Sequence, residues 1–354
     1  MVKIILDARK IEDYGIGVYA ENLFQGIIDS NQHHCRILHL GGTRYLMAPE
    51  RTFVEVSFKN YDLREHLEIP LKIRKLKDFY YFSPHYVFPL YIKNQLLVTV
   101  HDLIHFKFAH LFRPHLRVKI GRFFMQQVKE RAKIIFAVSQ KTRDDLVEVF
   151  GFGEDRIKVI YNGLSDLFFQ ESRKTSLFPF PYVIYVGNLK PHKNLPTLLR
   201  AFSMIKDTFS DLRLFLAGST PDKAFMLAIK ELGLEERVVF KPYLQQTELI
   251  RLLDGAEFFI FPSFYEGFGF PPLEAMARKK AVISSPGGSL REILGESALY
   301  FRPDSHDELA EKMSILIENE ELRKAYEEKG YSHSLSFRWD KALEQYLSCL
   351  QELD

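Results

Sequence analysis

Two glutamates in the second half of the chain have the type and spacing that a ligand-binding site needs. Glu266 follows a predicted strand and lies in a glycine-rich loop, and Glu274 lies on a predicted helix. Pro271 and Pro272 favour the start of that helix, because proline is well tolerated in a first helical turn. Loop amides and a helix N-terminus attract an anion or a polyhydroxyl group. The two carboxylates predict a site that holds separate parts of one ligand, such as a sugar ring and a ribose, beside the loop residues Gly267, Phe268 and Gly269.

Each of these glutamates also has a simpler explanation when it is taken alone. Glu274 could compensate the positive end of the helix dipole, and Glu266 could be a solvated loop charge. Neither explanation accounts for the complete segment from residue 263 to residue 277. The segment as a whole therefore favours a binding site.

A second glycine-rich segment follows the first predicted strand. Gly15 and Gly17 belong to the pattern G-x-G-x-x-A, which is typical of a turn that binds the diphosphate of a dinucleotide. Such a turn needs its first glycine directly after the strand, whereas here residues 9–14 intervene, and the next predicted strand, 35–40, offers no acid for a ribose. The pattern therefore excludes an NAD site. Two interpretations stay open: a loop that approaches an anion or a sugar closely, and a tight turn that requires glycine.

Strand and helix patterns alternate along the whole chain. The predicted strands of the first half are continuous apolar runs, as expected for strands buried in a parallel sheet, at 2–8, 35–40, 96–100, 134–138 and 157–161. A polar linker at 170–181 follows, and the pattern then restarts, with strands expected at 182–186, 213–217, 238–240, 258–261 and 281–284. Helical spacing at 16–28 and 340–350 completes the pattern. Two α/β units, each with a mainly parallel sheet, are the predicted architecture.

The distribution of charge agrees with two units. Residues 1–165 contain 25 Lys and Arg against 18 Asp and Glu, a net charge of +7, whereas the remainder contains 23 against 28, a net charge of −5. We expect an N-terminal domain at 1–168, a C-terminal domain at 169–334, and a final helix at 335–354 that crosses back to the first domain. The opposite charges predict that the two domains have different partners.

Composition restricts the class of protein. The chain has 354 residues, of which 46% are hydrophobic and 27% charged, as expected for a soluble globular protein. No apolar run approaches the ~20 residues that span a bilayer, and Asp7 comes too early for a signal peptide. The two distant cysteines, Cys35 and Cys349, favour a reducing compartment. These features predict a cytoplasmic protein, and the nearly neutral net charge without a recognition motif argues against nucleic-acid binding.

Taken in order, the segments resemble retaining glycosyltransferase family 4, whose GT-B fold has two Rossmann-like domains that face each other across a cleft. The most specific likeness is the E-x7-E segment at 263–277. Residues 185–194 resemble the family's donor-phosphate loop, and 15–17 resemble its N-terminal glycine loop. Residues 99–102, which end in His101 and Asp102, resemble the family's His-Asp motif after a strand of the N-terminal domain, and 159–163 resemble its lead into the interdomain linker. The similarity therefore covers essentially the entire chain.

The resemblance makes the domain at 1–168 the acceptor-binding domain and the domain at 169–334 the nucleotide-sugar-binding domain, and it assigns roles to the candidate residues. Glu266 and the amides of 267–269 would hold the hydroxyls of a donor sugar, Glu274 would hold the ribose hydroxyls, and His101 would contact the sugar from the other domain. A histidine followed by an aspartate is otherwise more often a capped turn, so the role of His101 depends on the resemblance alone. No covalent nucleophile is assigned, because the leaving phosphate is expected to help deprotonate the acceptor on the same face.

Charge on the leaving diphosphate needs fixed cations and amides. Lys193, the amides around Gly187, and the loop with Gly15 and Gly17 are the candidates. Many family members have an arginine where this chain has Asn188. Whether His192 or Lys190 supplies the second charge stays open.

The resemblance to bacterial mannosyltransferase-type members predicts that the chain moves a hexose, best matched by mannose from GDP-mannose. The acceptor would be a glycan or a lipid-linked glycan in the synthesis of cell-surface polysaccharide or lipopolysaccharide. We expect no metal, because no D-x-D pair or His/Cys cluster suggests a metal site. We also expect no cofactor, and GDP or UDP as the product. Two alternatives stay open: a nucleotide-sugar epimerase or hydrolase of the same fold, and a non-catalytic sugar-binding protein.

The segment 106–133 is basic and aromatic. It contains eight Lys and Arg and one acid, Glu130, and its aromatic residues are Phe106, Phe108, Phe112, Phe123 and Phe124. One interpretation is peripheral attachment to the anionic inner face of a membrane. The other is an ordinary helix whose aromatic residues lie in the core and whose cations are solvated. The sequence does not separate the two.

Overall fold

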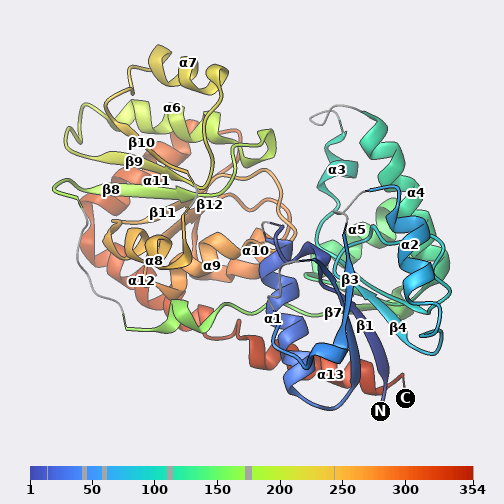
Figure 1. The fold of residues 1–354 in the computed structure, drawn as a ribbon. Helices are drawn as coiled ribbons and strands as arrows, with labels where there is room; N and C mark the ends of the chain where they lie inside the picture. The colour runs from blue at the N-terminus through green and yellow to red at the C-terminus, as the bar shows by residue number, and fades with distance from the viewer. Residues whose placement is uncertain are drawn as a thin grey trace. The chain divides into compact units, whose positions relative to one another are not determined.

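A computed structural model describes residues 1–13, 15–41, 46–57, 62–109, 115–171, 178–242 and 244–353. The chain divides into two compact units (Figure 1). Unit 1 comprises Met1–Gly163 together with Trp339–Asp354, and unit 2 comprises Leu164–Arg338. The C-terminal helix therefore belongs to unit 1.

Unit 1 contains a parallel sheet of seven strands in the order β3-β2-β1-β4-β5-β6-β7. The order runs away from β1 toward β3 in one direction and from β4 toward β7 in the other. Open α/β sheets bind ligands at the carboxyl ends of the strands where the order reverses, which here are β1 and β4. The strands are β1 (Lys3–Asp7), β2 (His34–Leu40), β3 (Phe53–Val56), β4 (Tyr80–Ser83), β5 (Leu96–Val100), β6 (Ala132–Ala137) and β7 (Ile157–Val159).

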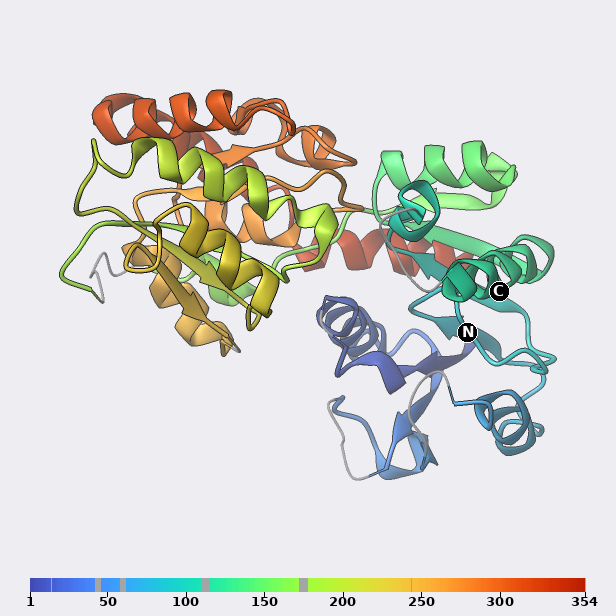
Figure 2. The ribbon, with the colours of Figure 1, turned by 90° about the horizontal axis from the view of Figure 1, so that it is seen from above.

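Helices cover both faces of this sheet (Figures 1 and 2). One apolar core lies under α1 and α13, around residues such as Phe24 and Tyr346, and the other lies under α2, α4 and α5, around residues such as Ile69 and Phe124. Because both faces are buried, the central strands are apolar without alternation. The helices are η1 (Ala8–Lys10), α1 (Ile16–Asp29), η2 (Glu50–Thr52), α2 (Glu65–Lys72), α3 (Ile104–Lys107), α4 (His115–Arg131), α5 (Gln140–Phe150), η4 (Glu154–Arg156) and α13 (Trp339–Gln351).

Unit 2 repeats this design with six parallel strands in the order β10-β9-β8-β11-β12-β13. Its order reverses between β8 and β11, so these two strands mark the expected ligand edge. The strands are β8 (Tyr182–Val186), β9 (Arg213–Ala217), β10 (Val238–Lys241), β11 (Phe259–Phe261), β12 (Val282–Ser284) and β13 (Leu299–Tyr300).

A buried ion pair ties the first residues of unit 2 to its helices. The Arg278 guanidinium donates from Nε and Nη2 to the two carboxylate oxygens of Asp254, at 2.7 Å each. Its Nη1 donates to the carbonyls of Phe168 and Gln170. The helices are η5 (Asp166–Phe169), η6 (Pro191–Lys193), α6 (Leu195–Ile205), α7 (Lys223–Glu231), α8 (Gln246–Gly255), α9 (Phe270–Ala277), α10 (Leu290–Leu294), η7 (Gly295–Ser297), α11 (His306–Glu318) and α12 (Glu320–Ser334).

The predicted fold class, two α/β units with parallel sheets, is confirmed. Every predicted strand is present to within a few residues, whereas β3, β4 and β13 were not predicted. Within the described ranges, no helix has both the length and the apolar character that crossing a bilayer requires.

Candidate functional site

The carboxyl ends of β8 and β11 bring together two of the predicted site residues. Lys193 ends η6, and Glu266 lies in the loop after β11. The Lys193 Nζ lies 2.6 Å from Glu266 Oε1, and both side chains are largely buried, at 11% and 15% exposure. The ammonium also lies 5.3 Å from the centroid of the Phe261 ring, which favours a cation there. The site thus combines a cation that could bind phosphate with a carboxylate that could accept hydrogen bonds from hydroxyls.

A neighbouring loop holds the backbone of Glu266 in place. Ser289 N–H donates to the Glu266 carbonyl at 2.9 Å, and Ser289 Oγ lies 3.2 Å from the carbonyl oxygens of Glu266 and Phe268. Gly288 has a φ of 66°, and a Cβ there would come within 2.2 Å of the Glu266 carbonyl oxygen. Sequence reasoning missed Gly288 and Ser289, although the paired glycines at 287 and 288 were a signal of close backbone approach.

The helix that carries Glu274 begins as the prolines predicted. Gly269 precedes it with a left-handed φ of 102°, and the first turn of α9 contains proline. Glu274 is half-buried, and burial raises the pKa of its carboxyl group to about 7. In the described part of the chain, this carboxyl group has no hydrogen-bond or ion-pair partner, so the structure does not join it to Lys193. A carboxyl group whose pKa is strongly shifted is a candidate for a functional site.

The loop after β8 is held by its own backbone. Gly187 N–H donates to the Ala217 carbonyl at 2.9 Å, and Tyr185 Oη donates to the Asn188 carbonyl at 2.7 Å. A Cβ at Gly187 would approach Tyr185 Oη to 2.6 Å. Asn188 Oδ1 in turn accepts from the Lys190 N–H at 3.2 Å. Glycine at 187 thus leaves room for the hydrogen bond from Tyr185 to the loop backbone, and the Asn188 side chain stabilises the turn that leads to Lys193.

The two candidates for the second cation differ in their surroundings. His192 is buried, and its carbonyl accepts a hydrogen bond from Phe264 N–H at 2.8 Å, which links this loop to the loop that carries Glu266. The side chain of Lys190 is exposed. His192 therefore lies within the bonded framework between the two loops, and Lys190 lies at its surface.

In unit 1, His101 follows β5 and is held on two sides. Its Nε2 lies 2.8 Å from the Pro84 carbonyl, which can only accept, so Nε2 carries the hydrogen. Its ring meets the edge of Tyr19 with centroids 4.7 Å apart, and Tyr19 Oη lies 2.6 Å from Thr99 Oγ1. Desolvation is the main cause that lowers the pKa of His101. A neutral His101 therefore offers Nδ1 as a hydrogen-bond acceptor.

Asp102, by contrast, has a structural role. Its Oδ1 accepts a hydrogen bond from Ile104 N–H at 3.0 Å, at the start of α3. This is the capped turn that a histidine followed by an aspartate commonly forms.

Two family models match the chain: "Glycosyltransferase Family 4" over residues 15–166 and "Glycosyl transferases group 1" over residues 168–333. The chain belongs to glycosyltransferase family 4. The O-antigen chain mannosyltransferase B of Escherichia coli is 26% identical over 292 residues, which are 79% of this chain and 76% of that protein. The O-antigen chain mannosyltransferase RfbU of Salmonella typhimurium is 30% identical over 225 residues, 63% of this chain and 60% of that protein.

Among solved structures, HepE of Anabaena in complex with UDP and glucose has a TM-score of 0.78 at 18% identity. The match covers 99% of this chain and 100% of HepE. At this identity the likeness shows the fold alone. It confirms the GT-B fold that the E-x7-E resemblance predicted for this glycosyltransferase.

The contacts of the glycine loop at 15–17 in this glycosyltransferase are those of a tight turn. Gly15 precedes α1 with a φ of 81°. Gly17 N–H donates to the Asp13 carbonyl at 2.7 Å, and a Cβ at Gly17 would come within 2.0 Å of the Ile11 carbonyl oxygen. Tyr14, which belongs to the same pattern, lies outside the described residues. These contacts explain glycine at 17, and donor binding by Gly15 and Gly17 stays a prediction.

The basic, aromatic segment divides between core and surface. Phe106 and Phe124 are buried in the core, as the ordinary-helix interpretation expects. On α4, however, three apolar side chains are exposed at helical spacing beside three exposed cations; Phe112 lies outside the described residues. This exposed stripe of α4 consists of Leu116, Ile120 and Phe123, with Arg117, Lys119 and Arg122.

Proposed function

We propose that this glycosyltransferase moves a sugar from a nucleotide donor to a glycan or lipid-linked acceptor, with retention of anomeric configuration, in the synthesis of cell-surface polysaccharide. The observation that carries the proposal is the contact between Lys193 and Glu266 at the carboxyl ends of β8 and β11. A donor of this class has a diphosphate next to a sugar, and this pair offers a cation next to a carboxylate. The half-buried Glu274 gives a third group, suited to ribose hydroxyls.

The proposed chemistry assigns one task to each group. Lys193 stabilises the charge that develops on the diphosphate as the sugar–phosphate bond breaks, together with amides of the Gly187 loop. Glu266 and the backbone of residues 267–269 orient the sugar hydroxyls. The leaving phosphate oxygen takes the proton of the acceptor hydroxyl on the same face of the sugar, which gives retention. Since a fixed ammonium and amides neutralise the leaving group, we propose that no metal ion takes part.

Mannose from GDP-mannose is the proposed donor. The relatives named above are mannosyltransferases, as is WbdA of Escherichia coli, which is 26% identical over 257 residues and of which the chain covers about a third. The complex of HepE with UDP and glucose makes UDP-glucose the competing donor.

A thermal-shift panel of GDP-, UDP- and ADP-sugars tests the donor directly. A ligand at a hundred times its Kd stabilises the native state by about 2.7 kcal/mol, which is a shift of several degrees. We expect GDP-mannose and GDP to give the largest shifts. A larger shift with UDP-sugars would move the proposal to that donor, and release of a C2 epimer or free sugar without any acceptor would replace transfer by epimerisation or hydrolysis.

We also propose that the enzyme works at the inner face of a membrane and uses the exposed stripe of α4 to reach a lipid-linked acceptor. The apolar side chains of this stripe could enter the interface while its cations contact anionic lipid head groups. The net charge of +7 on residues 1–165 supports this orientation of the first half of the chain toward an anionic surface.

A further inference from the structure

Unit 1 has a cationic group at its own ligand edge that the proposed donor site does not use. Lys10 ends η1, directly after β1, and His85 follows β4 by two residues. The register pairs Leu6 with Phe82, and Phe82 with Leu97, so β1 and β4 end at one level and β5 extends two residues further. Lys10 and His85 thus follow the two strands between which the order of unit 1 reverses, as Lys193 and Glu266 do in unit 2, and His101 follows the neighbouring strand β5.

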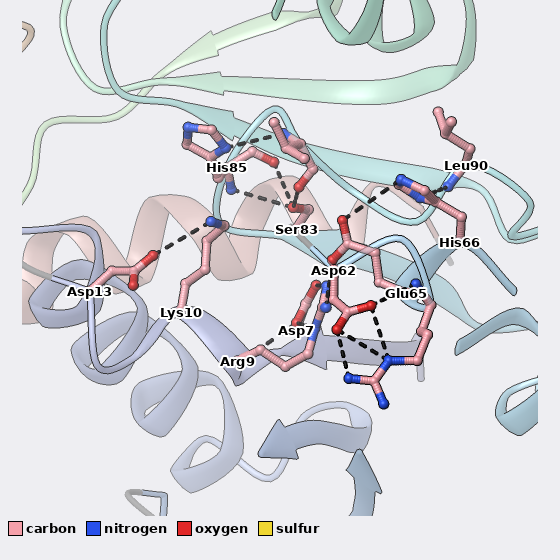
Figure 3. A network of polar contacts seen from close by, with 12 residues as sticks. Asp7, Arg9, Lys10, Asp13, Asp62, Glu65, His66, Ser83, His85 and Leu90 are labelled. Atoms are coloured by element: carbon pink, nitrogen blue, oxygen red, sulfur yellow. Dashed lines mark hydrogen bonds and ion pairs between the residues drawn. The ribbon is translucent and has the colours of Figure 1, made fainter. Parts of the chain in front are cut away.

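A buried network fixes the turn that carries Lys10 (Figure 3). The Arg9 guanidinium donates from Nε and Nη2 to the Asp7 carboxylate at 2.8 and 2.7 Å, and from Nη1 to Glu65 Oε2 at 2.8 Å. Tyr81 Oη donates to Asp7 Oδ2 at 2.6 Å. Because the Asp7, Arg9 and Glu65 side chains are at most 4% exposed, the turn is anchored to both β4 and α2. Lys10 is therefore placed by this network with little freedom.

The Lys10 ammonium is buried at the end of the turn that follows β1. The Lys10 side chain is 5% exposed. Its Nζ lies 3.5 Å from Asp13 Oδ2, and the Asp13 side chain is 43% exposed. Figure 3 shows Lys10 extending toward the side of the sheet on which His85 lies. Desolvation is the main cause that lowers the pKa of both His85 and His101, and the charge of Lys10 lowers both further. His101 and His105 also lower the pKa of His85, whereas the hydrogen bond to Pro84 and the charge of Asp102 raise the pKa of His101. The charge of Lys10 therefore acts on both rings.

Hydrogen bonds fix which nitrogen each histidine presents. Val87 N–H donates to His85 Nδ1 at 3.1 Å, so the neutral His85 carries its hydrogen on Nε2. His101 uses Nε2 to bond the Pro84 carbonyl, so its acceptor is Nδ1. The group thus has two donors, Lys10 Nζ and His85 Nε2, and one acceptor, His101 Nδ1. An anionic oxygen next to a hydroxyl complements this set.

We propose that Lys10 and His85 form an anion subsite for the acceptor, which takes a phosphate or carboxylate oxygen of a charged glycan. In this proposal His101 accepts a hydrogen bond from a hydroxyl of the acceptor, in place of the contact with the donor sugar that the resemblance predicted. The assignment to the acceptor rests on the proposed function, in which Lys193 of unit 2 binds the donor diphosphate. The substrate class is then narrower than a neutral glycan: the acceptor carries a negative charge close to the hydroxyls that are recognised.

The test follows the histidine side chains of the full-length protein by NMR while pyrophosphate is added, with His85 assigned from a His85→Gln variant. We expect saturable changes in the His85 signals of the wild type. Lys10→Met should weaken the apparent affinity at least tenfold, Lys10→Arg should keep it within about threefold, and Lys93→Met, which removes an exposed cation of unit 1, should leave it unchanged.

Two further titrations separate the sources of the charge. Methyl glucuronide probes a carboxylate, and neutral methyl mannoside should change His101 without the His85 response. A response of His85 to pyrophosphate or glucuronide supports the subsite and says which charge it prefers. A wild-type His85 that responds to neither, or a folded Lys10→Met variant that binds as well as the wild type, overturns it. GDP binding by the wild type, measured in parallel, keeps the two proposals apart. If GDP does not bind while His85 still responds, the donor site is refuted and the subsite is supported.

Discussion

Replacing Glu274 by glutamine should stabilise the free protein at pH 8 and have much less effect at pH 5. Burial raises the pKa of this carboxyl group from its ordinary value of 4.5 to about 7. The folded state therefore holds the proton more tightly than the unfolded state, and stability is lost as the pH rises from 4.5 to 7. Above pH 7 the ionised carboxylate is left buried without a compensating partner in the described structure, and glutamine removes that cost.

The magnitude follows from the same two values. Each tenfold change in proton affinity is about 1.4 kcal/mol, so the penalty approaches roughly 3 kcal/mol at pH 8 and stays under about 1 kcal/mol at pH 5. Since Glu274 is partly exposed, solvent reduces these figures, and we expect about 1–3 kcal/mol at pH 8. Urea unfolding of wild type and Glu274→Gln at both pH values measures the difference. Glu318→Gln, at an exposed position of α11, is the matched control.

The same variant should bind nucleotide less well, although it is more stable. If the ionised Glu274 accepts hydrogen bonds from ribose hydroxyls, GDP should bind the wild type more tightly as the pH rises from 6 to 8, whereas Glu274→Gln should show a flatter dependence. If the gain in unfolding free energy of Glu274→Gln over the wild type were no larger at pH 8 than at pH 5, the buried, uncompensated carboxylate would be refuted. A stabilised variant with unchanged GDP affinity would instead remove Glu274 from the nucleotide site.

Three further predictions concern the donor site and the surface. Lys193→Ala should lower kcat, with a loss of about 2–4 kcal/mol of transition-state stabilisation, and Glu266→Ala should lower kcat more than it lowers nucleotide affinity. Steady-state kinetics and GDP titrations measure both effects, and unchanged values for both variants would remove the pair from the site. His192→Ala should reduce turnover more than Lys190→Ala, and the reverse order in the same assay would make Lys190 the second cation. The wild type should sediment with anionic vesicles at low salt and be released at high salt, because each cation contributes about 1 kcal/mol near an anionic surface. Equal binding to neutral vesicles would count against the exposed stripe of α4 as a membrane contact. The charge-reversed variant for that experiment combines Arg117→Glu, Lys119→Glu and Arg122→Glu.

The sequence predicted the elements that are long and uniformly apolar. Strands such as β5 and β8 are buried on both faces, so their apolar runs have no alternation and are easily recognised. β13 has two residues and β3 and β4 have four each, too few to establish a period. The start of α9 was predictable because proline in a first helical turn depends only on local geometry.

The contacts within the site could not be predicted in the same way. Lys193 and Glu266 meet because β8 and β11 are neighbours, and the order of strands depends on the packing of the whole sheet rather than on either segment. For the same reason, no sequence pattern indicated that Lys10 and His85 flank the reversal between β1 and β4. The E-x7-E pattern located the carboxylates, whereas their burial, and hence the raised pKa of Glu274, needed the fold.

Calorimetric titration of GDP-mannose into the wild type and Lys193→Ala tests the central claim most directly, because it measures donor binding without an acceptor. Removing the ammonium leaves the Glu266 carboxylate unpaired and facing a diphosphate, so both lost attraction and new repulsion weaken binding. We predict saturable binding by the wild type and an affinity at least tenfold lower for Lys193→Ala, which is about 1.4 kcal/mol or more. Equal affinity for the two proteins, or no binding of GDP-mannose or any other nucleotide sugar by the folded wild type, would contradict a donor site at this pair.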